Sequence, residues 1–173
     1  MRAGEVAGAS ACLRHPVVVG DRLARQQSGR CWYAIAWQGE HPVGHALLHW
    51  RRPVPLAVSA GIDGLPYLED LFVRPETRGH GVGTSLLAAA ARAAAERGHR
   101  GMTLAVSVEN LGARRLYARL GYAPAGTPPR HQLSTDRGPD GAPHTHRETV
   151  LDLVLWLDGK AAQAPEELPP GAP

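Results

Sequence analysis

A glycine-rich turn constrains this chain of 173 residues more than any other feature. The stretch YLEDLFVRPETRGHGVGTSLL covers residues 67–87, and its glycines at 79, 81 and 83 separate a strand-like run from a helix-like run. Glycine lets the backbone approach a partner closely, and the first amides of a helix attract anions. The stretch therefore indicates a backbone cradle for a phosphate group.

The apolar pattern of the chain predicts one mixed α/β domain over residues 1–158, followed by a disordered proline-rich tail at 159–173. The first fifteen residues carry no periodic signal. Strands are expected at 31–37, 42–50, 66–73, 102–108 and 148–158, and helices at 84–97 and 109–121.

Three further segments have weaker patterns. PVVVG at 16–20 reads as a short strand, and 21–29 as a two-turn helix that Asp21 caps. Residues 123–147 are rich in proline, glycine and histidine, which predicts one long loop.

Composition excludes several classes of protein. The net charge of +3 comes from scattered arginines, which is weak support for nucleic-acid binding. Cys12 and Cys31 form no CxxC pair, so we expect reduced thiols in a cytoplasm. No apolar run approaches the roughly 20 residues that span a bilayer, so no membrane partner is expected.

Two common phosphate motifs fail at the glycine turn. A P-loop needs a lysine after its last glycine, and none follows Gly83. A dinucleotide fingerprint needs G-x-G-x-x-G and an acidic residue about 20 positions on, at the end of the next strand, whereas the acidic residue found at that strand end, Glu109, lies 28 positions past Gly81. The remaining pattern is Arg78-x-x-Gly81-x-Gly83, directly after a strand ending in LFV.

This pattern resembles the pyrophosphate-binding signature of the GNAT acyl-CoA N-acyltransferases. NLGARRLYARLGYAP resembles the second signature of that family, with Asn110 opening a helix and Tyr117 seven residues on. The resemblance covers residues 31–124, and YLEDLFV is similar to the matching strand of the polyamine acetyltransferases. It implies a mixed, mostly antiparallel sheet with splayed central strands, a β-α-β-α-β core and a shortened N-terminal helical region.

The resemblance also implies acetyl-CoA as co-substrate. The amides from Gly79 to Thr84 would hold the pyrophosphate, and the pantetheine arm would pair with the strand around Leu71, whose amide would stabilise the oxyanion. The implied coenzyme-binding residues are Leu71, Phe72, Val73, Arg78, Gly79, His80, Gly81, Val82, Gly83, Thr84, Asn110 and Arg114.

The resemblance implies two catalytic residues, Tyr117 and Glu69. Tyr117 would protonate the departing thiolate, although a core aromatic residue is the alternative. Asn110 would contact pantetheine, cap its helix, or do both. Arg114 or Arg115 would reach the 3′-phosphate, with a solvated surface arginine as the alternative.

Glu69 takes the position of the general base in the polyamine branch, with a substrate-charge contact or a structural carboxylate as alternatives. Strand alternation would turn Asp70 to the opposite face unless a bulge intervenes. Many members of the family carry the acidic residue nearer position 67, which is a tyrosine here.

The histidines do not predict a metal site. His41, His45 and His49 are spaced by four, but on a strand His45 and His49 stand about 13 Å apart. His131, His144 and His146 in the expected loop could form a zinc site or contact substrate, and no metal is our expectation.

The function implied is acetyl transfer from acetyl-CoA to a primary amine by direct attack in a ternary complex. The acceptor would be a small amine (polyamine-, amino acid- or aminoglycoside-like) or a peptide amine. A non-catalytic acyl-CoA-binding module for regulation or assembly is the alternative. The short region before Cys31 leaves three explanations: a more open acceptor pocket, completion by a second copy in a homodimer, or a start that lies too late.

Overall fold

A computed structural model of the chain describes residues 16–52, 61–137 and 143–158. The predicted tail and the first fifteen residues lie outside these ranges. The elements in order are α2 (Pro16–Gln27), β1 (Cys31–Gln38), β2 (His41–His49), β3 (Tyr67–Val73), a 3₁₀ helix (Pro75–Thr77), α3 (Val82–Glu96), β4 (Gly101–Ser107), α4 (Leu111–Arg119), β5 (Ala123–Pro124), β6 (Arg130–Arg137) and β7 (Pro143–Trp156).

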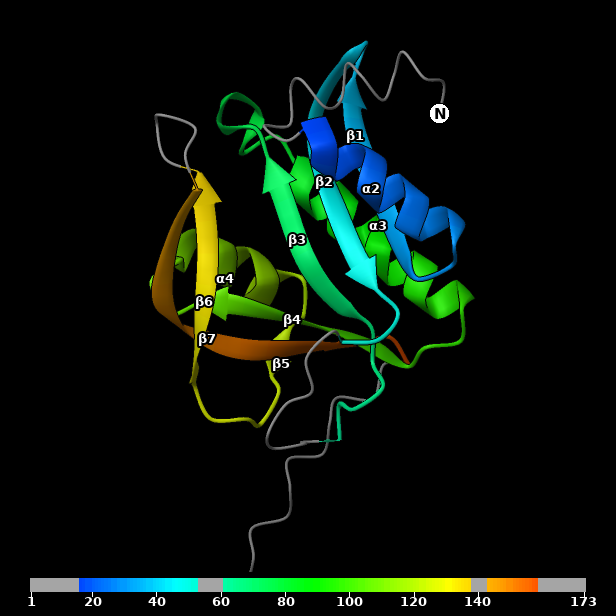
Figure 1. Cartoon of the computed structure of the whole chain (residues 1–173). Helices are drawn as coiled ribbons and strands as arrows, with labels where there is room; N and C mark the ends of the chain where they lie inside the picture. Colours follow the sequence, from blue (N-terminus) through cyan, green and yellow to red (C-terminus); the bar gives the residue numbers. More distant parts are fainter. Residues whose placement is uncertain (1–15, 53–60, 138–142, 159–173) are drawn as a thin grey trace, which may run out of the picture.

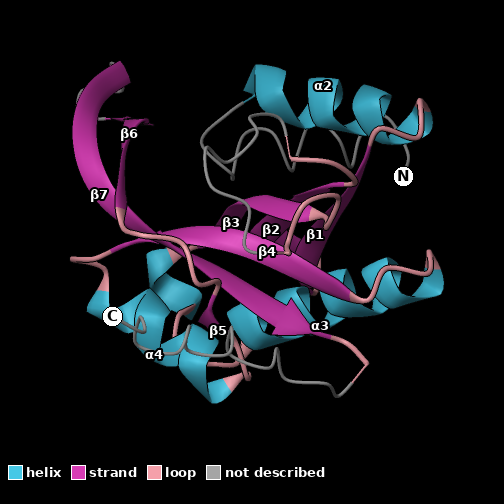
Figure 2. Cartoon of the chain, turned by 90° about the horizontal axis from the view of Figure 1, so that it is seen from below, coloured by secondary structure: helices cyan, strands magenta, loops and turns pink. Residues whose placement is uncertain are grey.

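The strands form one sheet in the order β1-β2-β3-β4-β7-β5, with β6 added on β7. Among the described strands, only β3 and β4 pair in parallel. Helices α3 and α4 cover one face of the sheet, and α2 lies on the other face (Figures 1 and 2). The hairpin β6–β7 curls toward the side that carries α2 (Figure 2). This mixed, mostly antiparallel architecture confirms the predicted fold class.

The main core lies between the sheet and α3. The apolar stripe of this helix is buried as its spacing predicts, through Leu86, Leu87, Ala90 and Ala94. Against it pack buried residues of the central strands such as Leu68. Burial of each such leucine contributes about 2 kcal/mol to folding, so α3 and the glycine turn before it are held firmly against the sheet.

Strands β3 and β4 share only a short common stretch. They pair at Tyr67 with Thr103 and at Leu68 with Leu104, and no pairing follows beyond that point. Each strand keeps its other neighbour, because β3 pairs with β2 as far as Val73 and β4 pairs with β7 as far as Ser107. The two strands therefore run apart (Figure 1), which confirms the splay that the family resemblance implied.

The N-terminal part of the described chain differs from the prediction. Residues 16–27 form one helix, α2, instead of a short strand and a separate two-turn helix. Pro16 is compatible with the first helical turn, and Val19 is buried against Tyr33 and Leu47. Tertiary packing of this kind overrides the strand preference of valine. Asp21 consequently lies inside the helix, where it pairs with Arg25 at 2.7 Å.

The predicted long loop at 123–147 was also wrong. Most of it forms β5, β6 and the first half of β7, and β6 pairs with β7 from Arg130–Val150 to Arg137–Pro143. The side chains described along this hairpin are mostly polar and partly or fully exposed. A ribbon whose two faces meet solvent needs no apolar alternation, so the pattern that reveals strands was absent.

Candidate active site

Backbone amide and carbonyl groups of β3 point into the gap between β3 and β4. The Arg74 amide donates to the Val43 carbonyl at 2.9 Å, toward β2. A Cβ built on Gly44 would lie 2.6 Å from the Phe72 carbonyl, so that carbonyl also faces β2. Along an antiparallel strand, the backbone N–H and C=O groups of one residue point to the neighbouring strand on one side, and those of the next residue point to the other side. Leu71 and Val73 therefore direct their amides and carbonyls away from β2, toward the gap that β4 has left.

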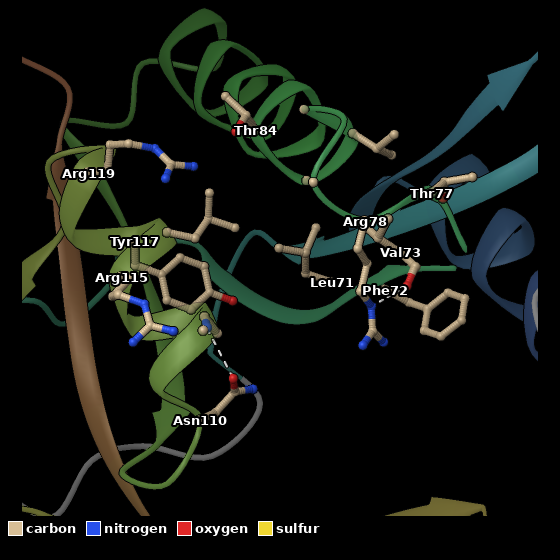
Figure 3. A pocket seen from close by; sticks show the side chains of 17 residues that line it. Leu71, Phe72, Val73, Thr77, Arg78, Thr84, Asn110, Arg115, Tyr117 and Arg119 are labelled. Atoms are coloured by element: carbon tan, nitrogen blue, oxygen red, sulfur yellow. Dashed lines mark hydrogen bonds between the residues drawn. The ribbon is translucent and has the colours of Figure 1, made fainter. Parts of the chain in front are cut away.

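A cleft of about 700 Å³ lies in this gap, bounded by β3, the start of α3 and α4. Figure 3 shows its labelled side chains. Tyr117 and ten of the twelve residues predicted to bind coenzyme line it. The ten are Leu71, Phe72, Val73, Arg78, Gly79, Gly81, Val82, Gly83, Thr84 and Asn110.

The glycine turn forms the end of the cleft at the start of α3. Gly79 and Gly81 have φ angles of 81° and 83°, in the left-handed region that favours glycine. Gly81 is the N-cap of α3 and provides no side chain to cap it. The first helix-type bond there runs from the Ser85 amide to the Gly81 carbonyl at 2.9 Å. The preceding amides are the orphan donors that attract an anion at a helix N-terminus.

Several arginines line the cleft, but one arginine that was predicted to bind coenzyme there, Arg114, does not. Arg78 lines it and donates from Nε to the Val73 carbonyl at 3.1 Å. Arg115 and Arg119 on α4 line it as well (Figure 3). Arg114 does not, because its guanidinium donates to the Val108 carbonyl at 3.0 Å. The spacing of α4 could have revealed Arg119, which lies one helical turn beyond Arg115.

His80 is the other predicted residue outside the cleft lining. It is exposed, and its ring bonds to the Arg78 carbonyl at 3.0 Å. Asn110 caps α4, since its Oδ1 accepts from the Ala113 amide at 3.0 Å. The cap uses only this oxygen, so the side-chain amide nitrogen of Asn110 is left for a ligand in the cleft, which Asn110 also lines. Capping and ligand contact are therefore compatible at this position.

Tyr117 brings a phenol into the cleft. Its side chain is 7% exposed, and its ring lies 5.5 Å from that of Tyr122. Among the described residues its hydroxyl has no hydrogen-bond partner, and it points into the cleft (Figure 3). Burial, followed by the charge of Asp70, raises the pKa of Tyr117 to about 12. The phenol is therefore fully protonated near neutral pH and is available as a proton donor.

A β-bulge changes the direction of the two acidic residues in β3. Leu68 lies opposite Leu48 and Asp70 opposite Leu47, so Glu69 is an extra residue in its strand. A bulge of this kind interrupts alternation. Glu69 contacts His49 and Asp70 contacts His45, and both histidines lie on the face of β2 that looks toward α2. The expected alternation of Glu69 and Asp70 to opposite faces was thus wrong, for the one reason that the sequence left open.

Glu69 is held by one neighbour. The His49 ring donates from Nε2 to the carboxylate, and this hydrogen bond outweighs burial and lowers the pKa of Glu69. The carboxylate is 45% exposed, whereas the His49 side chain is 12% exposed. Glu69 is therefore ionised at neutral pH and accessible from the α2 side of the sheet.

Asp70 is held by a larger network. Arg22 of α2 donates to Oδ2 at 2.6 Å, and His45 donates to the same oxygen at 3.1 Å. Tyr33 in turn donates to His45 Nδ1 at 3.3 Å. Burial alone would raise the pKa of Asp70, but the bonds from His45 and Arg22 outweigh burial and lower it. No local sequence pattern predicts this network, because its members come from α2, β1, β2 and β3.

A second buried carboxylate, Asp152 of β7, was also missed. Its side chain is 0% exposed and accepts from Arg52 at 2.6 Å and from Arg130 at 2.9 Å. The Arg52 guanidinium stacks 4.2 Å from the centre of the Tyr67 ring. Tyr67 is thus in contact with this cluster through Arg52. In the sequence, Asp152 is one polar residue within an apolar strand, and the sequence alone does not show which partners its carboxylate has.

The remaining predictions concern metals, thiols and membranes. The described ranges hold no group of three histidine, cysteine, aspartate or glutamate side chains able to bind a metal ion. Cys31 is a buried free thiol, and Cys12 lies outside the described residues. Within the described residues, no helix is long and apolar enough to cross a membrane.

Comparison with known proteins gives concordant matches. The model of the acetyltransferase (GNAT) family matches residues 10–122. A stretch of 55 residues is 46% identical to an uncharacterised N-acetyltransferase of Methanocaldococcus jannaschii. That stretch is 32% of this chain and 24% of the relative, so the match spans about a quarter of the relative's length.

Solved structures share the fold at low identity. The ribosomal-protein-alanine N-acetyltransferase of Brucella melitensis is 17% identical, with a TM-score of 0.65 over 90% of this chain and 96% of that one. The ribosomal-protein-S18-alanine N-acetyltransferase of Escherichia coli is 19% identical, with a TM-score of 0.61 over 95% of each chain. An aminoglycoside N-acetyltransferase in complex with CoA is 22% identical, with a TM-score of 0.60 over 74% of this chain and 92% of that one.

Proposed function

Because this chain belongs to the acetyltransferase (GNAT) family, we propose that it transfers the acetyl group of acetyl-CoA to a primary amine by direct attack in a ternary complex. The observation that carries this proposal is the gap between β3 and β4. It brings together the orphan amides at the start of α3, the outward backbone of Leu71 and the Tyr117 phenol, whose hydroxyl has no hydrogen-bond partner among the described residues. A pyrophosphate, an extended arm and a thioester need these groups in this order.

The glycine turn would hold the pyrophosphate of acetyl-CoA. The amides of Val82, Gly83 and Thr84 open the helix without a side-chain cap, and the helix dipole adds partial positive charge. Arg115 and Arg119 line the same cleft and would hold the 3′-phosphate. The pantetheine arm would then pair with the exposed edge of β3 between Leu71 and Val73, as an added strand does.

The reaction follows from this placement. The amine nitrogen forms a bond to the thioester carbonyl carbon, and the carbonyl oxygen gains charge that the Leu71 amide stabilises. The carbon–sulfur bond breaks, and Tyr117 gives its proton to the departing thiolate. Glu69, acting directly or through a water molecule, takes one proton from the amine nitrogen. These steps yield an acetylated amine and free coenzyme A. Glu69 then releases its proton to solvent, and the Tyr117 phenolate takes up a proton from solvent.

The acceptor is proposed as a small amine or a peptide amine. The open face beside β3 presents Glu69 and Asp70, whose carboxylates are more exposed than the basic groups that hold them. Such a face attracts a protonated amine. Solved proteins of this fold include acetyltransferases named for ribosomal-protein alanine and for aminoglycosides, so both acceptor types are compatible with the scaffold.

The decisive experiment measures thiol release from acetyl-CoA against polyamines, amino acids, aminoglycosides and alanine-starting peptides. Calorimetric titration with acetyl-CoA runs in parallel. We expect tight acetyl-CoA binding and thiol release that depends on at least one amine. Binding without release for any acceptor would favour an acyl-CoA-binding module instead. Absence of binding would overturn both functions.

A further inference from the structure

We propose that Asp70 holds the acceptor amine by a second hydrogen bond and thereby restricts the reaction to primary amines. This inference rests on the proposed function. It assigns a specificity-determining role to a residue that the family signatures do not include. The supporting observations are the bulge in β3, the way each carboxylate is anchored, and the position of Tyr117.

The bulge places two consecutive carboxylates on one face. In a regular strand, Glu69 and Asp70 would point to opposite sides, but the register shift opposite Leu47 and Leu48 turns both toward α2. Like charges this close repel each other, and the charge of Asp70 indeed acts to raise the pKa of Glu69.

Each carboxylate is anchored by one oxygen. In the described ranges, the contacts of Asp70 from Arg22 and His45 both go to Oδ2. The contact of Glu69 from His49 goes to Oε2. The second oxygen of each group is left for another donor. Asp70 is 32% exposed while Arg22 is 12% exposed, so the open side of the pair is the carboxylate side.

Asp70 also lies within electrostatic reach of the cleft. Its charge contributes, after burial, to the raised pKa of Tyr117. The Tyr117 side chain is more than nine-tenths buried, and its hydroxyl points into the cleft without a partner among the described residues (Figure 3). Leu71, whose amide is proposed to hold the thioester oxygen, follows Asp70 directly in the chain. Asp70 is therefore the chain neighbour of the proposed oxyanion donor, and its charge acts on the Tyr117 phenol.

The number of hydrogens on the amine explains the selectivity. A neutral primary amine has two N–H groups and one lone pair. One N–H bonds Glu69, which takes that proton during attack, and the other bonds Asp70, which takes none. The lone pair is then aimed at the thioester carbonyl. A secondary amine has a single N–H group and presents its N-alkyl group to one of the carboxylates, which leaves that ion without its donor.

The alternative is that Asp70 only ties α2 to the sheet through Arg22. Two substitutions separate these roles. Asp70→Asn and Arg22→Gln both break the ion pair, but only Asp70→Asn removes the carboxylate. A structural tie predicts that both variants behave alike. A role toward the amine predicts that Arg22→Gln keeps the selectivity and Asp70→Asn loses it.

The test compares n-butylamine with N-methylbutylamine, together with the fastest acceptor from the amine panel and its N-methyl form. For wild type we expect kcat/KM to favour the primary amine by about 10- to 100-fold, the ratio that one charged hydrogen bond supports. Asp70→Asn should lower the primary-amine kcat/KM by a similar factor and bring the ratio close to one. Its affinity for acetyl-CoA should stay within about twofold of wild type, as expected for a site apart from the glycine turn.

Three results would overturn the inference: equal rates with both amines in wild type, an unchanged ratio in Asp70→Asn, or a ratio lost equally in Arg22→Gln. If Asp70→Asn does not fold, Asp70→Ser removes the carboxylate with a smaller side chain, and the ratio should again fall close to one, whereas an unchanged ratio in Asp70→Ser would overturn the inference. Failure of wild type to transfer acetyl to any amine would instead overturn the proposed function itself. The two failures are therefore distinguishable.

Discussion

Leu68 and Leu104 are the last residues at which β3 and β4 lie side by side. Beyond them each strand follows its outer neighbour, β3 along β2 and β4 along β7. The edge of β3 from Leu71 onward is thereby left unpaired inside the sheet. An unpaired edge of this kind is the natural partner for an extended ligand, and the proposed reaction depends on it.

Gly83 offers the cleanest test of the glycine turn. A Cβ at this position would meet Leu116 at 3.5 Å and Val73 at 3.7 Å, which are ordinary contacts. Gly83→Ala should therefore leave the fold intact and stabilise α3 by about 0.5–1 kcal/mol. Gly83 lines the cleft, so the added methyl group would narrow the end of the cleft at which the pyrophosphate is proposed to lie. We expect coenzyme A affinity, measured by calorimetry, to fall by at least about tenfold.

Gly20→Ala is the matched control, because Gly20 lies within α2 and its Cβ would meet no atom within 4 Å. It should gain similar stability and keep full affinity for coenzyme A. Equal affinity of Gly83→Ala and Gly20→Ala for coenzyme A would show that the pyrophosphate does not bind at this turn.

Tyr117→Phe tests the proton donor. Loss of general acid catalysis typically lowers kcat by about 10²- to 10⁴-fold, while acetyl-CoA affinity should be unchanged. Since the pKa of Tyr117 is raised to about 12, the phenol stays protonated through the accessible range. Steady-state rates of wild type should show no decline from its ionisation below about pH 11.

Tyr122→Phe serves as the control for this substitution. The Tyr122 hydroxyl is buried and has no partner among the described residues, yet it does not line the cleft. Its removal should leave kcat unchanged and should not weaken the fold. A kcat for Tyr117→Phe close to that of Tyr122→Phe would exclude the assigned role.

Glu69→Gln tests the base. Because the hydrogen bond from His49 lowers the pKa of Glu69, Glu69 is already ionised throughout the neutral pH range. The rise of kcat/KM with pH should then follow deprotonation of the amine rather than of Glu69. Glu69→Gln should reduce kcat by about 10²-fold or more at every pH. Glu40→Gln removes the same charge from an exposed turn, and a comparable loss there would show a mere charge effect.

Asp152 should control stability at acidic pH. Burial would raise the pKa of Asp152, but hydrogen bonds from Arg130 and Arg52 outweigh burial and lower it. The lowered pKa means that the carboxylate stabilises the fold above the unfolded value of about 3.9 and loses this effect as pH falls through the folded value. Urea unfolding of Asp152→Asn should show a loss of about 3 kcal/mol at pH 7 that narrows below pH 4.

Asp21→Asn provides the comparison for Asp152. Asp21 forms an exposed pair with Arg25 inside α2, and such pairs contribute about 0.5 kcal/mol or less. An equally small loss in Asp152→Asn would mean that the buried cluster does not stabilise the domain.

Local patterns in the sequence were sufficient to predict the family, the fold and most of the predicted coenzyme-binding residues that line the cleft. The glycines at 79, 81 and 83 act through backbone conformation, and the buried stripe of α3 follows helical spacing. Both signals are contained within a few consecutive residues. The family assignment that rested on them is confirmed by the match over residues 10–122.

What the sequence did not reveal depends on contacts between distant segments. The anchoring of Asp70 joins residues 22, 45 and 70, and the cluster at Asp152 joins residues 52, 130 and 152. The bulge at Glu69 is a property of strand pairing, and no residue type marks it. The hairpin β6–β7 lacks apolar alternation because both of its faces are polar. The proposed acceptor face, at Glu69 and Asp70, depends on two of these features, the bulge and the anchoring of Asp70.

A crystal structure with coenzyme A bound would be the sharpest test of the proposed coenzyme site. We expect pyrophosphate oxygens on the amides of Gly81 to Thr84 and pantetheine amides bonded to the backbone of Leu71 and Val73. We also expect the coenzyme sulfur within hydrogen-bond reach of the Tyr117 hydroxyl. Coenzyme A bound elsewhere, or β3 and β4 closed on each other along their whole length in the complex, would contradict the proposed site.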